Sequence, residues 1–306
     1  MPNDNESQSL VSILNGITLE KTPQSLYEVF VVVQDICRWG INNQPIDNYG
    51  WLKYENIESI VERFSLPSIT KEHIEDFVNK LSDEDIGNDY INMQTPHSSY
   101  RISGFTLSAF INYYAKEDDI IELDISHLRK LGYLGHLRHS KVILRGIKET
   151  LEIDSEGNVL SVDNNLGPGI GEFMEGGELE IFGDYLGDQD FGRFMKGGKL
   201  ILHGNAGYGV FRCMENGEGI IYGDVPHGMV GVGMNGGKIT IHGHVGIDTK
   251  FFPKRTIEYP NVGFDSSGGE IYLLGSYEDM APSNPKMLDR KCLIYSQGNL
   301  LPQIQE

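Results

Sequence analysis

Two close pairs of histidines are the first candidates for a metal site. The pairs are His242 with His244, and His136 with His139. His203 has the position of His242 in another copy of the repeat described below, but Tyr222 occupies the copy between them, so the two rings would lie about 10 Å apart. Zinc ligands lie only about 2.0–2.1 Å from the metal. We therefore predict exposed histidines and no metal site.

Neither the cysteines nor the glycine-rich segments predict a reactive centre. Cys37, Cys213 and Cys292 are too far apart in the chain to hold an iron–sulfur cluster locally, and the sequence suggests no histidine base for any of them. The segments 167–171 and 204–209 fit neither of the glycine motifs that bind phosphate after a strand. We expect no catalytic residue and no cofactor.

The glycines belong to a repeat instead. Each copy starts at a methionine, passes two small residues, continues as a short strand and closes on a glycine. The methionines Met174, Met195, Met214 and Met234 follow one another at steps of 21, 19 and 20 residues. A period of about 20 residues is typical of stacked repeats.

Each copy alternates apolar and other residues, as a half-buried strand does. Stacked copies would bring equivalent side chains into columns about 4.8 Å apart. The methionines would form one column inside the coil. A second column would hold Phe173, Phe194, Cys213 and Gly233, with Cys213 buried, and an outward third would hold Phe182, His203, Tyr222 and His242.

Glycines mark both ends of each strand, where we expect sharp corners with positive φ. The glycines before the strands are Gly177, Gly198, Gly217 and Gly237, and those after them are Gly183, Gly204, Gly223 and Gly243. Weaker copies at 132–146 and 268–275, and part of another at 151–163, extend the pattern. The prediction is a parallel β-helix of about five to seven coils.

The unit Gly228-Met-Val-Gly231-Val-Gly233-Met-Asn-Gly-Gly-Lys-Ile-Thr-Ile-His-Gly243 resembles the GXGXG domain, which occurs in the glutamate synthase large subunit and in formylmethanofuran dehydrogenase. The resemblance covers residues 132 to 275 and implies an all-β right-handed parallel β-helix. It also implies a non-catalytic scaffold subunit or adaptor, whose partners would be amidotransferase, flavoprotein or molybdopterin-enzyme components. Any oxidoreductase activity would then belong to the assembly.

We expect four parts in the chain. Residues 1–22 are polar and predicted to be disordered, and residues 23–118 show helical spacing. The β-helix spans 119–275 with an insertion at 245–267, and residues 276–306 form a capping tail. The helical domain would cover the open first coil, so the whole chain is α+β.

Composition argues against two classes of partner. The chain has 44 acidic and 25 basic residues and a net charge of −19, the wrong sign for binding nucleic acid. No apolar run approaches the roughly 18 residues of a membrane span. Three scattered cysteines fit a reducing, cytoplasmic compartment.

One insertion is a candidate for contact with a partner. It clusters aromatic and basic residues in an otherwise acidic chain, at Phe251, Phe252, Lys254, Arg255 and Tyr259. An enzyme or small-molecule binder, with its pocket between the helical domain and the coils, is the alternative function.

Overall fold

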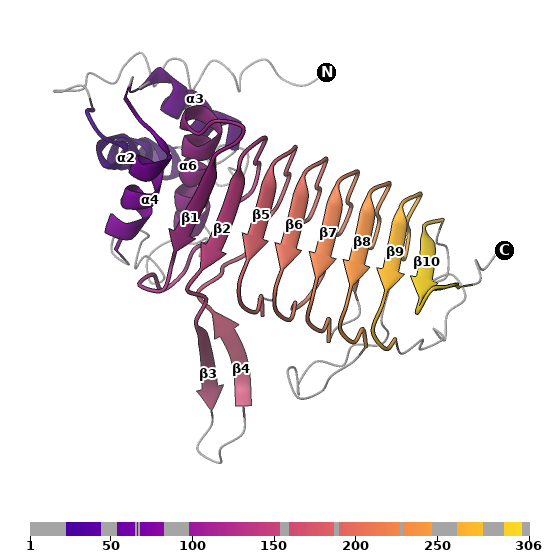
Figure 1. Ribbon diagram of the computed structural model, residues 1–306. Helices are drawn as coiled ribbons and strands as arrows, with labels where there is room; N and C mark the ends of the chain where they lie inside the picture. The colour runs from indigo at the N-terminus through magenta and orange to yellow at the C-terminus, as the bar shows by residue number, and fades with distance from the viewer. Residues whose placement is uncertain are drawn as a thin grey trace.

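A computed structural model describes residues 23–43, 54–64, 66, 68–82, 98–153, 159–186, 190–226, 229–246, 262–277 and 291–301. The fold is a parallel β-solenoid of about 6 turns with a few helices at its N-terminal end (Figure 1). The predicted β-helix is therefore confirmed as a parallel solenoid.

The described helices are α2 (Leu26–Asn43), α3 (Tyr54–Arg63), α4 (Lys71–Lys80) and α6 (Ser98–Tyr114). Their apolar faces pack together and onto the first coil, in one continuous core. In the described residues, no helix has the length and apolar character to span a bilayer.

The main sheet has nine strands in the order β1-β2-β5-β6-β7-β8-β9-β10-β11. Eight are parallel, each pairing with the equivalent strand of the next coil. The strands are β1 (Ile120–Asp124), β2 (Lys141–Arg145), β5 (Glu178–Ile181), β6 (Lys199–Leu202), β7 (Glu218–Ile221), β8 (Lys238–Ile241), β9 (Glu270–Leu273), β10 (Leu293–Ser296) and β11 (Asn299–Leu300). Because short strands cannot bury their apolar face alone, stacking is what stabilises each of them.

The segment 151–163 does not join a coil, contrary to the sequence-based prediction. β3 (Glu149–Ile153) and β4 (Val159–Asn164) pair antiparallel with each other in a separate two-stranded sheet. The hairpin extends away from the coils (Figure 1). These two strands satisfy their backbone groups locally, so they need no neighbouring coil.

The C-terminal segment also differs from expectation. β10, within the predicted capping tail, continues the parallel sheet beyond residue 275. β11 then turns back and pairs antiparallel with β10. The tail thus adds the parallel strand β10, and β11 covers part of the free edge of β10. This covering limits edge-to-edge pairing with other chains.

At the other end, α4 covers the free edge of β1. The Lys71 ammonium group donates to the Ile120 carbonyl at 2.9 Å, and the Glu122 amide donates to the Glu75 carboxylate at 2.9 Å. Side chains of α4 therefore satisfy backbone groups that a ninth parallel strand would otherwise engage.

The predicted interior column is present in the solenoid. Met174, Met195, Met214 and Met234 all have zero exposed area. In the second predicted column, Phe173, Phe194 and Cys213 have a left-handed backbone conformation, with φ of 55°, 56° and 53°. Cys213 is only partly buried, because that column lies at a corner and not inside the coil, so the prediction of a buried Cys213 is wrong.

The glycines before the strands have the predicted conformation, with φ of 66°, 76°, 97° and 84° at Gly177, Gly198, Gly217 and Gly237. After the strands, Gly183 has φ 141°, but the other three glycines are not left-handed. The expectation of positive φ is therefore wrong for Gly204, Gly223 and Gly243. A Cβ atom on any of these three would collide with the glycine carbonyl of the preceding coil, so close backbone approach explains them instead.

Candidate functional site

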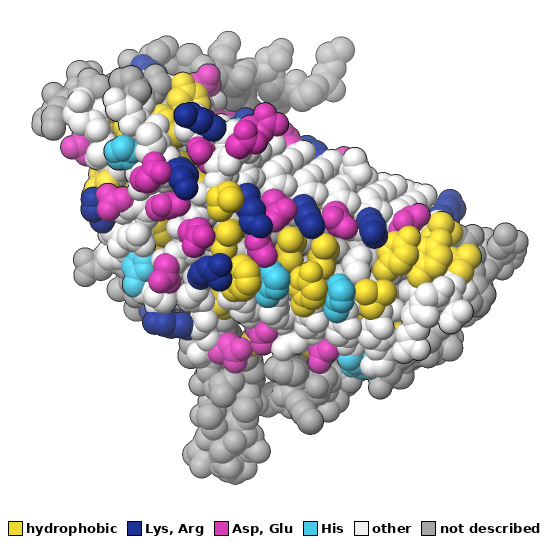
Figure 2. Space-filling view, viewed as in Figure 1, with side chains coloured by type: hydrophobic (Ala, Val, Ile, Leu, Met, Phe, Trp, Pro, Cys, Tyr) yellow, Lys and Arg dark blue, Asp and Glu magenta, His cyan; other side chains and the backbone are white. Residues whose placement is uncertain are grey.

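The outer face of the parallel sheet carries three columns of side chains, contributed by the first, third and fifth positions of successive coils. The second and fourth positions point into the core, as the alternating burial of β5, β7 and β9 shows. Figure 2 shows this face with a row of alternating basic and acidic side chains and, beside it, a row of hydrophobic and histidine side chains.

The first column alternates in charge from coil to coil. Its members, in the register of the sheet, are Lys141, Glu178, Lys199, Glu218, Lys238 and Glu270. Lys141 lies 2.7 Å from Glu178, and Glu218 lies 3.7 Å from Lys199 and 3.8 Å from Lys238. The sequence contains this signal, since each charge precedes the first inward residue of its strand, but sequence reasoning missed it.

The fifth position forms a continuous stack of rings. The predicted members Phe182, His203, Tyr222 and His242 stack in that order, with centroids 4.2, 4.9 and 4.6 Å apart and planes 6°, 10° and 25° from parallel. The Arg145 guanidinium lies 4.1 Å from the Phe182 centroid and closes one end. Tyr222 separates the two histidines, as predicted.

This stacking determines what the surface offers a ligand. Each inner ring is covered on both faces by its neighbours, so solvent meets ring edges, imidazole nitrogens and the Tyr222 side chain, which is 47% exposed. A sugar or a base needs a free ring face on which to stack. An edge-on stack suits protein side chains that pack against the edges of the rings.

Between these columns, the third position holds Glu180, whose charge is balanced by side chains of the columns on either side. The Glu180 carboxylate lies 2.5 Å from the Lys141 ammonium and 2.7 Å from Nε2 of His203. The hydrogen bond from Lys141 lowers the pKa of Glu180, and the bonds to Glu178 and Glu180 raise the pKa of Lys141. The face therefore combines local charge balance with exposed apolar area.

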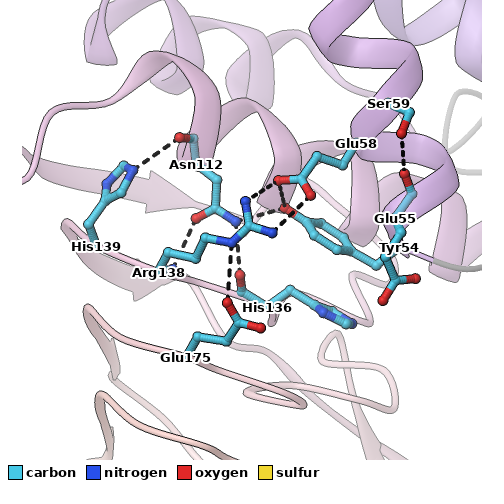
Figure 3. A network of polar contacts seen from close by, with 9 residues as sticks. All are labelled: Tyr54, Glu55, Glu58, Ser59, Asn112, His136, Arg138, His139 and Glu175. Carbon is cyan, nitrogen blue, oxygen red and sulfur yellow. Dashed lines mark hydrogen bonds and ion pairs between the residues drawn. The ribbon is translucent and has the colours of Figure 1, made fainter.

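A second polar cluster joins the helices to the first coils (Figure 3). Arg138 donates to both oxygens of Glu58 at 2.6 and 2.9 Å and to Glu175 at 3.3 Å. The Asn112 amide nitrogen donates to the Tyr54 hydroxyl at 2.7 Å and to the His136 carbonyl at 2.8 Å. The polar groups of these residues bind one another across the junction, so the cluster holds the helices against the first coils.

His136 lies inside this junction as the second ring of another stack, which begins at Tyr54. It lies 4.2 Å from Tyr54 and 5.0 Å from Phe173, and Phe194 continues the stack at 5.0 Å. Burial, with smaller contributions from Lys196 and Arg138, depresses the pKa of His136 to about 3. The folded protein therefore holds this imidazole neutral throughout the mildly acidic range.

Acidification should destabilise the protein through His136. The unfolded chain binds a proton near pH 6.5 while the folded chain does not, so stability present above pH 6.5 is lost as pH falls towards about 3, at up to about 1.4 kcal/mol per pH unit. Phe173 and Phe194 hold the same left-handed conformation as His136, so His136→Phe should fold. We expect the free energy of unfolding, measured by denaturant titration, to fall between pH 7 and about 4.5 by about 2 kcal/mol less in the variant than in the wild type.

The control for this measurement is His242→Phe, which changes an exposed histidine. It should retain the acid sensitivity of the wild type. Equal acid losses in the wild type and His136→Phe would show that His136 is not the group responsible.

The predicted contact residues of the insertion, Phe251, Phe252, Lys254, Arg255 and Tyr259, lie outside the described residues. Cys37, Cys213 and Cys292 are not joined by disulfides. In the parts of the chain that the structure describes, no three His, Cys, Asp or Glu side chains group as a metal site would require.

Comparison with known proteins brings no further assignment. No protein-family model, curated protein or solved structure matches this chain. The geometry of the sheet face and of the junction is therefore the basis for a functional conclusion.

Proposed function

We propose that this protein is a non-catalytic structural subunit or adaptor that binds another protein chain on the outer face of its parallel sheet. The observation that carries the proposal is the exposed ring stack running beside an alternating row of charges over consecutive coils. Backbone pairing in register fixes the spacing of both rows. A rigid surface loses little conformational entropy when a partner binds.

The chemistry of this face favours protein over other ligands. Aromatic side chains and arginine are enriched at protein interfaces, and here both lie in one row. The ring faces are already used within the stack, which leaves them poorly suited to sugars and bases. The charged column holds equal numbers of lysines and glutamates, so it offers no excess positive potential for phosphates.

The likeness to the GXGXG domain supports the same kind of role. Every coil has left-handed residues at its corner, and Gly171 with Phe173, Gly192 with Phe194, and Gly231 with Gly233 are equivalent pairs. We propose that the chain is a β-helix of this type in the cytoplasm and serves an assembly of amidotransferase, flavoprotein or molybdopterin-enzyme components. Catalysis would then belong to those partners.

The alternative of a ligand pocket at the junction has less support. There Arg138, Asn112 and Tyr54 are bound to neighbouring side chains, and the rings around His136 are stacked. A ligand would have to displace this network, at the cost of its hydrogen bonds.

Cross-linking at lysines tests the proposed face. With the native complex, we expect links to partner proteins from Lys199 and Lys238 on the face, and few from Lys196, which is exposed in the same coil as Lys199 but off the face. Tyr222→Asp should weaken capture of the partner about tenfold or more, because it places a charge in the centre of the ring stack. Links through Lys196 alone would contradict the proposal.

The matched control is Asn216→Asp. It adds the same charge at an exposed position of the same coil, just before β7, and should leave capture unchanged. Circular dichroism should show both variants folded. Equal loss of capture in the two variants would place the interface elsewhere.

A further inference from the structure

The charged column of the sheet is antisymmetric along the solenoid. From β1 to β10 it contains Ile120, Lys141, Glu178, Lys199, Glu218, Lys238, Glu270 and Leu293. Reversing the order exchanges every lysine for a glutamate and leaves an apolar residue at each end. The midpoint lies between Lys199 and Glu218.

This pattern is self-complementary under one particular two-fold rotation. An axis that lies in the plane of the interface, parallel to the strands and level with the midpoint, reverses the order of the coils and keeps each position along the strand. Two copies facing each other about this axis bring Lys199 against Glu218, Glu178 against Lys238, and Lys141 against Glu270. Every charge in the column then meets its opposite.

The other two columns are compatible with the same rotation. In the third position Ile201 meets Ile220 next to the axis, and the Glu180 carboxylate meets the hydroxyl of Thr240. In the fifth position His203 meets Tyr222. Within each copy, main-chain hydrogen bonds keep this position in the register of the strands. No like charges oppose each other in either column, and the middle column has an apolar pair at the axis.

Other face-to-face arrangements are less favourable. Moving the axis by half a coil, to the level of Glu218, places Lys199 against Lys238. Moving it by a whole coil, to lie between Glu218 and Lys238, keeps opposite charges together but sets Glu178 against Leu293 and leaves Lys141 unpaired. Turning the axis by 90° sets the charged column against the ring column, with no paired charges. The column therefore favours the central register, which pairs all six charges, and excludes axes level with a strand, because like charges opposite each other are destabilising.

We infer that the protein bound on the sheet face is a second copy of this chain, in the two-fold arrangement described. This rests on the proposed function, that the face binds protein. Figure 2 shows the face uncovered over the middle strands. Eight strands spaced about 4.8 Å apart, each roughly 13–16 Å long, bury roughly 500–600 Å² per copy. The total of about 1,000–1,200 Å² is near the lower limit for specific interfaces, so the dimer should be weak, with a Kd in the micromolar range.

Sedimentation velocity of the full chain tests the inference. Between about 1 and about 200 μM the wild type should shift from 34.2 kDa to twice that mass. Salt at about 1 M should weaken the dimer, since the pairs are exposed to solvent. A wild type that stays monomeric at every concentration in low salt overturns the inference.

Two single substitutions and their mixture give a sharper result. Lys199→Glu puts glutamate against glutamate at the two central contacts of a dimer, and Glu218→Lys puts lysine against lysine there. Each variant alone should dimerise at least about tenfold more weakly than the wild type. An equimolar mixture should recover dimerisation, because every charge in the mixed pair meets its opposite. Weak homodimers without recovery on mixing would reject this register.

Thr240→Glu is a second probe that leaves the charged column intact. In the dimer it faces Glu180 of the second copy, whereas its own column neighbours are Ile220 and Tyr272. It should weaken the dimer while the monomer keeps its melting temperature. Full dimerisation by this variant overturns the inference. A monomeric wild type that still cross-links to a different protein through Lys199 would reject self-association but leave the proposed function standing.

Discussion

Gly104→Ala should destabilise the protein by about 3 kcal/mol or more, although glycine to alanine within a helix ordinarily stabilises by roughly 0.5–1 kcal/mol. Gly104 lies in α6 where the helix crosses the backbone of the first coil. A Cβ atom there would collide with the carbonyl oxygen of Gly132 and the carbonyl of Tyr133. Both obstacles are main chain, so relief requires the helix to move away from the coil.

Chemical denaturation of the full chain checks this expectation. The comparison is Ser108→Ala, which removes the bonds of one buried hydroxyl at the same interface without adding volume. That change should cost only about 1 kcal/mol. If Gly104→Ala proved as stable as the wild type, α6 would not lie as close to the coil as the structure has it.

Gly198→Val should be similarly damaging, at about 3 kcal/mol or more. Gly198 has φ 76°, which a β-branched side chain strongly disfavours, and its Cβ would collide with the Gly176 carbonyl of the preceding coil. The two effects add because the corner is both left-handed and tightly stacked. The loss of stability in Gly198→Val should appear as a much lower denaturant concentration at the midpoint of unfolding.

Gly298 separates these two effects. It has φ 81°, but a Cβ atom there would meet nothing within 4 Å. Gly298→Ala therefore measures the conformational cost alone, about 1 kcal/mol, and Gly198→Ala measures that cost plus the collision. If Gly298→Ala and Gly198→Ala lowered the free energy of unfolding equally, close stacking of the coils would not explain why glycine is needed at the corners.

The proposed role of the sheet face depends on the same stacking. Coils held in register keep Lys199, Glu218 and the rings of His203 and Tyr222 at fixed spacing. A loosened corner would therefore disturb binding as well as stability. Variants such as Gly198→Ala should be excluded from binding assays for that reason.

The repeat made much of the solenoid predictable. Methionines every 20 or so residues and alternation within each unit determine which side chains face in and which face out, and the structure has Met214 inside and Tyr222 outside as expected. Local spacing is sufficient here, because each strand pairs with a copy of itself. The glycines before the strands were predictable for the same reason, since a corner of one shape recurs in every coil.

Features outside the repeat were not predictable in this way. The hairpin of β3 and β4 and the strand β10 were not predicted, because the repeat does not show which segment each of these strands pairs with. His136 gave no sign in the sequence that it would be buried between Tyr54 and Phe173. The left-handed Phe173 and Phe194 replace glycine, so a search for glycine motifs passes over them.

The sequence by itself determined that the chain coils, because a constant period forces equivalent residues to stack and leaves one face of each strand for solvent. Only the tertiary structure decided where the coils start and stop and how α4 covers β1. These features depend on contacts between residues far apart in the chain. The burial and hydrogen bonds that stabilise such contacts produce no local pattern in the sequence.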